Sequence, residues 1–146
     1  VYGGEAQTLA DLDPQAFIAT LTTNALAPLM LARALLPAVI RSQRKIIANQ
    51  SSRMGSIADN GSGGFYAYRA SKAALNMITK SLAEDVKSEG VIAVALHPGW
   101  VKTRMGGAHA PVTPQDCVAG QQRVLDGLTP SQSGKFFDYT GAELPW

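Results

Sequence analysis

Cysteine is almost absent from this chain: Cys117 is the single one in 146 residues, so no disulfide can form within it. A reducing compartment, the cytoplasm, is therefore expected. Cys117 lies in an amphipathic helical pattern, which favours core packing over a role as thiol nucleophile. His97 and His109 lack further ligands at metal-binding spacing, so no metal site is expected. Charge is also scarce, at 16% of residues and a net +2, and its scatter predicts no nucleic-acid partner.

A continuous membrane-spanning run, a signal peptide and an initiating methionine are missing as well. The longest apolar stretch, residues 24–40, is interrupted by Asn24, Arg33 and two prolines, which argues against a membrane span. Residues 1–13 lack the basic start and apolar core of a secretory signal. Because the chain begins with Val1, we expect it to be a fragment or processed piece of a longer protein.

The first long pattern is helical. Asp13 is a good N-cap, and a helix is predicted over residues 14–42, with Pro28 and Pro37 kinking or locally breaking it. Apolar side chains cover most of its circumference, which predicts burial on two sides, for example by a sheet and by a partner subunit. No linker divides the chain, so a single domain over residues 1–146 is expected.

Strands and helices alternate after this helix. Strands are predicted over residues 45–52, 91–98 and 135–141, helices over 66–89 and 114–128, and a Gly/Ser-rich loop over 53–64. Strands that are apolar on both faces and alternate with helices indicate a parallel sheet covered by helices, the α/β class. Ligands of such sheets bind beyond the carboxyl ends of the strands, where Ser52 and the Pro98-Gly99 pair stand.

Tyr68 and Lys72 lie four residues apart at the start of a predicted helix and therefore share one face. A tyrosine hydroxyl has a pKa of about 10, so it is a poor acid or base at neutral pH unless a nearby ammonium group stabilises its anion. We expect Lys72 to lower the pKa of Tyr68 in this way. The pair alone is a weak signal, and a surface tyrosine with a neighbouring lysine is the alternative. The preceding strand, serine pair and glycine-rich loop favour an acid/base site, in which a serine hydroxyl polarises a carbonyl.

Three segments, NQSSRMGS, YAYRASKAAL and HPGWVKT, together resemble the C-terminal part of the short-chain dehydrogenase/reductase family. The resemblance covers nearly the whole chain. The segments SSRMGSI, PGWVKTRMGG and FFDYTGAELPW are similar to the carbonyl-reductase branch, which includes C-factor-type signalling proteins. The resemblance implies an α/β fold that is the C-terminal half of a doubly wound Rossmann fold, without its N-terminal βα units. It also implies hydride transfer between a nicotinamide and a small carbonyl/alcohol substrate.

The resemblance implies roles for individual residues. Tyr68 would be the general acid/base, Lys72 would also hold the nicotinamide ribose, and Ser52 would polarise the substrate carbonyl. Asn24 would hold a water molecule of the proton relay, and a satisfied amide in the core is its alternative role. Besides Tyr68 and Lys72, the implied cofactor-binding residues are Pro98, Gly99, Val101 and Thr103.

The loop after these residues, 104–113, would be a mobile substrate lid in which Gly106 and Gly107 supply flexibility. Three nearby apolar side chains either line a substrate pocket or pack in the core: Met54, Trp100 and Met105.

The phosphate-binding sequence of the family, TGxxxGxG, does not occur in this chain. Without it the adenine and pyrophosphate half of the cofactor has no cradle. The residues that would distinguish NAD from NADP are absent too. Of the two cofactors, NADP is slightly favoured. We expect roughly 80–100 further residues before Val1 and no activity from the 146 residues alone. A non-enzymatic signalling or interaction module that dimerises through its long helices is the alternative, and a homodimer or homotetramer is expected.

Overall fold

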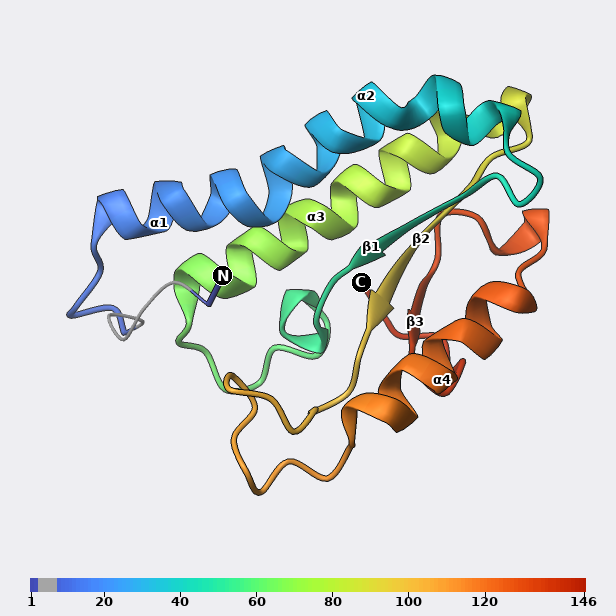
Figure 1. Cartoon of the computed structure of the whole chain (residues 1–146). Helices are drawn as coiled ribbons and strands as arrows, with labels where there is room; N and C mark the ends of the chain where they lie inside the picture. The colour runs from blue at the N-terminus through green and yellow to red at the C-terminus, as the bar shows by residue number, and fades with distance from the viewer. Residues whose placement is uncertain (3–7) are drawn as a thin grey trace.

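Helices and strands alternate along the chain in the computed structural model, which describes residues 1–2 and 8–146 (Figure 1). The α-helices are α1 (Pro14–Leu21), α2 (Ala27–Arg41), α3 (Tyr66–Asp85) and α4 (Pro114–Asp126). The strands are β1 (Ile46–Gln50), β2 (Ile92–His97) and β3 (Phe136–Asp138). Short helical segments are η1 (Thr22–Leu26, a π-helix), η2 (Arg53–Gly55), η3 (Lys87–Glu89) and η4 (Pro130–Gln132). The predicted α/β order is confirmed, and the three strands are shorter than expected.

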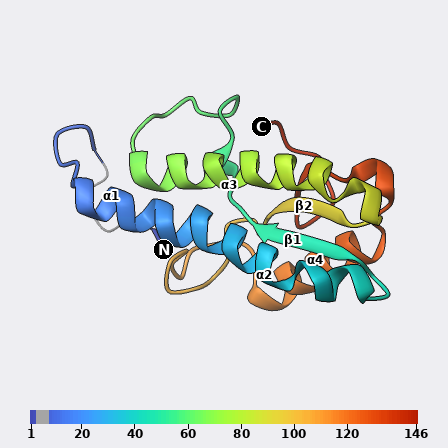
Figure 2. The ribbon, with the colours of Figure 1, turned by 90° about the horizontal axis from the view of Figure 1, so that it is seen from above.

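The three strands form one parallel sheet in the order β1-β2-β3. Gln50 pairs with Leu96, and His97 pairs with Asp138, so the three strands end at a common edge. The helices α2 and α3 lie over one face of the sheet, α1 continues α2 end to end and packs along α3 past the strands, and α4 covers the other face (Figures 1 and 2). This arrangement brings the loops after β1 and β2 together at the carboxyl edge.

Strand β2 carries the core on both of its faces. Ala93 packs against α3 and α2 in a cluster with Leu82 and Val86. Val94 and Leu96 face the other way, toward partly buried side chains of α4. Small residues on the α3 side let that helix approach the sheet closely, and α3 is the element that presents Tyr68 and Lys72.

The first helix differs from its prediction in winding. It runs from Pro14 to Arg41 without interruption, and Pro37 lies inside α2. The winding changes to π in η1, directly before Pro28, where wider turns accommodate the missing amide donor of proline. The predicted break is therefore a local π segment at Pro28, and none occurs at Pro37.

The outer face of α1 and α2 is open in this chain, so the expected burial on two sides is limited here to the side that packs on α3 and β1. Exposed apolar side chains of this continuous helix include Ile18, Leu26, Met30, Leu31 and Leu35, of which Leu31 and Leu35 line a groove beside β1. By length and composition alone, residues 14–41 are apolar enough to cross a membrane, with a mean hydropathy of 1.5. One such helix is weak evidence for a membrane span, because helices of soluble proteins reach the same length and composition.

Candidate active site

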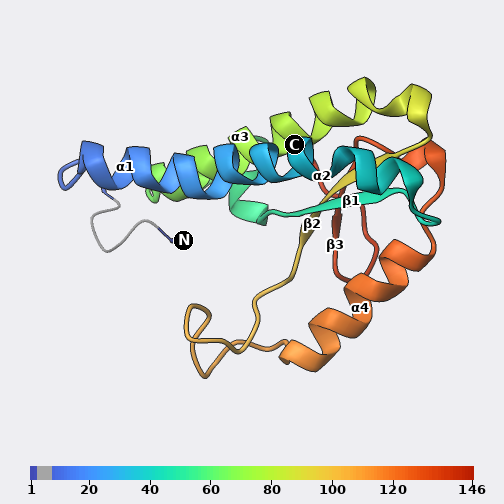
Figure 3. The same cartoon turned by 45° about the horizontal axis from the view of Figure 1, so that its top comes forward.

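A cavity of about 580 Å³ lies at the carboxyl edge of the sheet, a volume typical of small-molecule sites. Figure 3 shows the long loop between β2 and α4, which supplies one of its walls. Six residues singled out from the sequence line the cavity: Ser52, Tyr68, Pro98, Gly99, Val101 and Thr103. The three apolar side chains expected near the substrate line it as well: Met54, Trp100 and Met105.

Ser52 and Tyr68 meet across this cavity. Ser52 follows β1, is 8% exposed, and caps η2 by accepting a hydrogen bond from the Met54 amide at 3.2 Å. Tyr68 lies in the first turn of α3, is 9% exposed, and lines the same cavity as Ser52, whose hydrogen bonding lowers the pKa of the Tyr68 hydroxyl. A strand end and a helix start thus bring two hydroxyl groups together.

Burial dominates the electrostatics of Tyr68. It raises the pKa of the Tyr68 hydroxyl, the hydrogen bond with Ser52 lowers it, and the nearby Tyr2 raises it. Lys72 places its Nζ 5.8 Å from the Tyr68 ring centroid and donates to the Gln50 carbonyl at 2.8 Å. Burial lowers the pKa of Lys72. The expected net lowering of the Tyr68 pKa is therefore not found: burial leaves it raised, and the interaction that opposes burial comes from Ser52.

Asn24 lies in the π segment η1, behind α3 rather than in the wall of the cavity. Its Nδ2 donates to the Val1 carbonyl at 2.7 Å and to Ser71 Oγ at 3.0 Å, and its Oδ1 accepts from the Val1 nitrogen at 2.7 Å. Ser71 Oγ in turn donates to the Tyr68 carbonyl at 2.8 Å. The Asn24 amide is thus fully hydrogen-bonded, and the Ser71 hydroxyl links it to the Tyr68 carbonyl. Its role in a proton relay stays a prediction.

Gly99 shapes the loop after β2. Its φ of +82° is a left-handed conformation that side chains rarely adopt. A Cβ there would also lie 2.8 Å from the Tyr139 ring. Backbone conformation and space both require glycine at this wall of the cavity.

Gly106 differs from its expected role. An added Cβ would overlap the Val101 carbonyl oxygen, so the residue allows a close approach of backbone. Its amide donates to Thr103 Oγ1 at 3.2 Å, and its carbonyl accepts from Trp100 Nε1 at 2.7 Å. The start of the loop is therefore tied together, and Gly106 supplies close packing where we expected flexibility.

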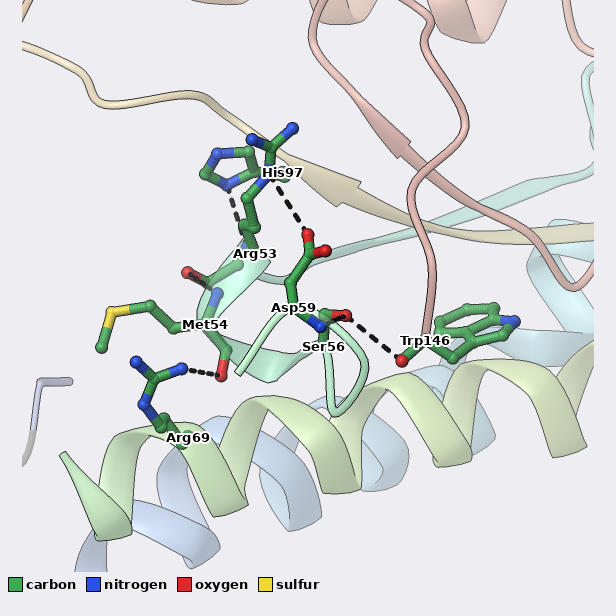
Figure 4. Close-up of polar contacts among 8 residues, drawn as sticks. Arg53, Met54, Ser56, Asp59, Arg69, His97 and Trp146 are labelled. Atoms are coloured by element: carbon green, nitrogen blue, oxygen red, sulfur yellow. Dashed lines mark hydrogen bonds and ion pairs between the residues drawn. The ribbon is translucent and has the colours of Figure 1, made fainter. Parts of the chain in front are cut away.

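Sequence reasoning missed Tyr2 and His97, which also line the cavity. The Tyr2 ring lies 4.9 Å from that of Tyr68 and 5.6 Å from that of Phe65, between centroids. His97 ends β2, and its Nδ1 accepts a hydrogen bond from the Arg53 amide at 3.2 Å (Figure 4). No local pattern marks Tyr2, whereas the place of His97 directly before the Pro-Gly pair was an available signal.

Burial lowers the pKa of His97 to about 4, with the Arg53 charge acting in the same direction and the Asp138 charge opposing it. The unfolded chain, with a histidine pKa of about 6.5, therefore binds this proton first as the pH falls. We expect His97 to reduce stability progressively between pH 6.5 and 4. NMR titration of the His97 imidazole should give a midpoint near 4.

His97→Asn is the matched variant, because its Oδ1 can still accept from the Arg53 amide but does not titrate. It should flatten the pH dependence of unfolding in that window. A His97 midpoint near 6.5, or an unchanged pH dependence in the variant, would contradict this explanation.

The residues present fit the nicotinamide half of a dinucleotide. The cavity lies where parallel α/β sheets bind cofactors, and the bare Gly99 backbone and the Ser52 and Tyr68 hydroxyls face it. The sequence offers no TGxxxGxG turn for the pyrophosphate.

Comparisons with known proteins find similar sequences and similar structures. The sequence profile of the short chain dehydrogenase family matches residues 3–111. The "C-signal" protein of Myxococcus xanthus is 50% identical over 138 residues, which are 94% of this chain and 83% of that protein. The carbonyl reductase Sniffer of D. melanogaster is 38% identical, with a TM-score of 0.93 over 97% of this chain and 62% of that one. The NADPH-bound carbonyl reductase from chicken fatty liver is 37% identical, with a TM-score of 0.90 and the same coverage. The chain therefore spans somewhat less than two thirds of these solved reductases.

Proposed function

Since this chain belongs to the short-chain dehydrogenase family, we propose that it is the catalytic part of an NAD(P)-dependent oxidoreductase that interconverts a carbonyl compound and its alcohol. The meeting of Ser52 and Tyr68, which both line a cavity at the carboxyl edge of the sheet, is the observation that carries this proposal. The similarity to two carbonyl reductases supports the carbonyl as the reacting group.

A nicotinamide, when bound, would supply the hydride. The residues of this chain would donate the proton and position the substrate. Tyr68 donates a proton to the carbonyl oxygen, and its raised pKa keeps the hydroxyl protonated at neutral pH. Ser52 donates a hydrogen bond to the same oxygen and stabilises the negative charge that develops there. Lys72, whose Nζ lies 5.8 Å from the Tyr68 ring centroid, would assist the proton transfer and hold the ribose, and Asn24 would support the relay behind α3.

The loop after β2 would hold the nicotinamide through four residues: Pro98, Gly99, Val101 and Thr103. All four line the cavity beside Tyr68. The apolar wall favours an uncharged substrate, because burying a charge without a partner is costly. NADP is the proposed cofactor, supported by the similarity to an NADPH-bound carbonyl reductase.

Cofactor binding and turnover test this function in the native polypeptide that contains these residues. We expect NADPH to bind, measured by its fluorescence, and to be oxidised in the presence of aldehydes or ketones. We expect no turnover from residues 1–146 alone, because the sequence has no pyrophosphate cradle. The proposal is wrong if the native polypeptide binds neither NADPH nor NADH.

The similarity to the Myxococcus xanthus C-signal favours one second candidate, a signalling or interaction module. Its contact surface would be the open apolar face of α1 and α2, with assembly as a homodimer or homotetramer in the cytoplasm. Light scattering separates the two proposals when read with the cofactor titration. A stable dimer that binds neither cofactor favours the module, and cofactor binding with turnover favours the enzyme.

A further inference from the structure

Asn76 continues the face of α3 that carries the acid/base pair. It lies four residues after Lys72 and eight after Tyr68, so the three side chains follow one another on successive turns. Asn76 is 3% exposed. A buried amide in a helix that otherwise packs on the core requires hydrogen-bond partners, and those partners show what it holds.

Both ends of the Asn76 amide bind the segment that contains Ser52. Ser51 Oγ donates to Asn76 Oδ1 at 2.5 Å, and Asn76 Nδ2 donates to the Gly55 carbonyl at 3.2 Å. The two contacts lie on either side of Ser52 in the sequence. Gly55 also rests against α3, because a Cβ at this position would lie 2.7 Å from Lys72. The turn η2 is thus fastened to the helix at its start and at its end.

The orientation of Ser52 depends on this same turn. Its hydroxyl accepts from the Met54 amide at 3.2 Å, and its carbonyl accepts from the Gly55 amide at 2.8 Å. A displaced turn therefore displaces the Ser52 hydroxyl relative to Tyr68. Since Tyr68 and Asn76 belong to one rigid helix, that helix fixes both partners of the pair.

We propose that Asn76 is a positioning residue for Ser52, holding the η2 turn so that the serine and tyrosine hydroxyls reach one carbonyl oxygen together. This inference rests on the proposed function, in which Ser52 and Tyr68 act on the substrate. Asn76 lines no part of the cavity and acts through the turn alone.

A second buried amide offers a matched control. Asn49 Nδ2 donates to Thr79 Oγ1 at 2.8 Å, and this bond joins β1 to α3. Asn49 is 8% exposed, and its side-chain hydrogen bond to Thr79 involves no residue of η2. Asn49→Leu and Asn76→Leu each remove one buried amide from the interface between α3 and the segment that runs from β1 into η2. A loss that comes only from stability should affect both variants alike.

Kinetics of the native polypeptide test the proposal. We expect Asn76→Leu to lower kcat about tenfold with little change in the KM for NADPH, because sub-ångström misplacement slows chemistry. Asn49→Leu should lower the melting temperature similarly and keep kcat within about twofold. In a Ser52→Ala background, Asn76→Leu should cause no further loss of kcat, since the hydroxyl that it positions is gone. Ser51→Ala, which removes one of the two contacts, should show a smaller loss with the same dependence on Ser52.

Amide hydrogen exchange gives a readout that does not depend on activity. Exchange at Met54 and Gly55 should rise in Asn76→Leu and stay at the wild-type level in Asn49→Leu. Equal exchange in the two variants, or a kcat loss that multiplies with that of Ser52→Ala, would overturn the positioning role. If Ser52→Ala keeps the wild-type kcat, the catalytic reading of the pair fails and the inference falls with it. If amide exchange at the turn is nevertheless faster in Asn76→Leu, then Asn76 does hold the turn, and it is the proposed function that is wrong.

Discussion

Tyr68→Phe should lower the rate of carbonyl reduction in the native polypeptide by about 10²–10⁴-fold, the usual contribution of a positioned general acid. The substitution removes one hydroxyl group and keeps the ring that packs against Tyr2 at 4.9 Å. The fold and the affinity for NADPH should therefore stay close to wild type. Single-turnover measurement of NADPH oxidation reports the chemical step directly.

The direction of the Tyr68 pKa determines the pH dependence of this reaction. Burial raises the pKa of a hydroxyl whose ordinary value is 10.0, so Tyr68 is protonated across the neutral range. Reduction, which needs the protonated form, should be independent of this group at neutral pH and decline only in strong alkali. Oxidation of the alcohol, which needs the phenolate, should accelerate as the pH rises.

Tyr66→Phe is the control for these measurements. Tyr66 precedes Tyr68 by two residues on the same helix, is 39% exposed, and does not line the cavity. Its loss should change the rate by less than about twofold. A Tyr68→Phe rate as close to wild type as that of Tyr66→Phe would remove Tyr68 from the mechanism.

The sequence predicted the part of the site that depends on the order of elements. Carboxyl ends of parallel strands meet at one edge, so Ser52 and Gly99 had to lie near one another once the strands were recognised. Tyr68 joined them because its helix follows β1 and packs on the same sheet. The cap at Asp13 was also predicted, since N-cap chemistry is local.

Features that depend on tertiary packing could not be predicted from the order of elements in the sequence. Tyr2 reaches the cavity only through the folded position of the N-terminal residues, and its sequence neighbours give no sign of it. The role of Asn76 depends on the turn that it meets across the helix–sheet interface. The direction of the Tyr68 pKa shift was predicted from one neighbouring charge, whereas burial of the hydroxyl in the folded chain raises its pKa.

Ser52→Ala should lower the reduction rate by about 10²–10³-fold, the cost of losing one donor to a developing oxyanion. It should also destabilise the protein by about 1 kcal/mol, because Ser52 caps η2 and Met54 loses its acceptor. Ser52→Thr keeps a hydroxyl for both tasks and should restore much of the rate and stability. Ser56→Ala is a control from the same loop, because the buried Ser56 hydroxyl donates to the Trp146 carbonyl (Figure 4).

Ser52→Ala carries a further signature that separates catalysis from stability. The hydrogen bond from Ser52 lowers the pKa of Tyr68, so its removal leaves burial less opposed and raises that pKa further. The alkaline rise in the rate of alcohol oxidation should therefore shift to higher pH in Ser52→Ala and return toward wild type in Ser52→Thr. Ser56→Ala should leave the profile in place, since a change in stability alone does not move the pKa of Tyr68. An unshifted profile in Ser52→Ala would show that the two hydroxyls do not act as a pair.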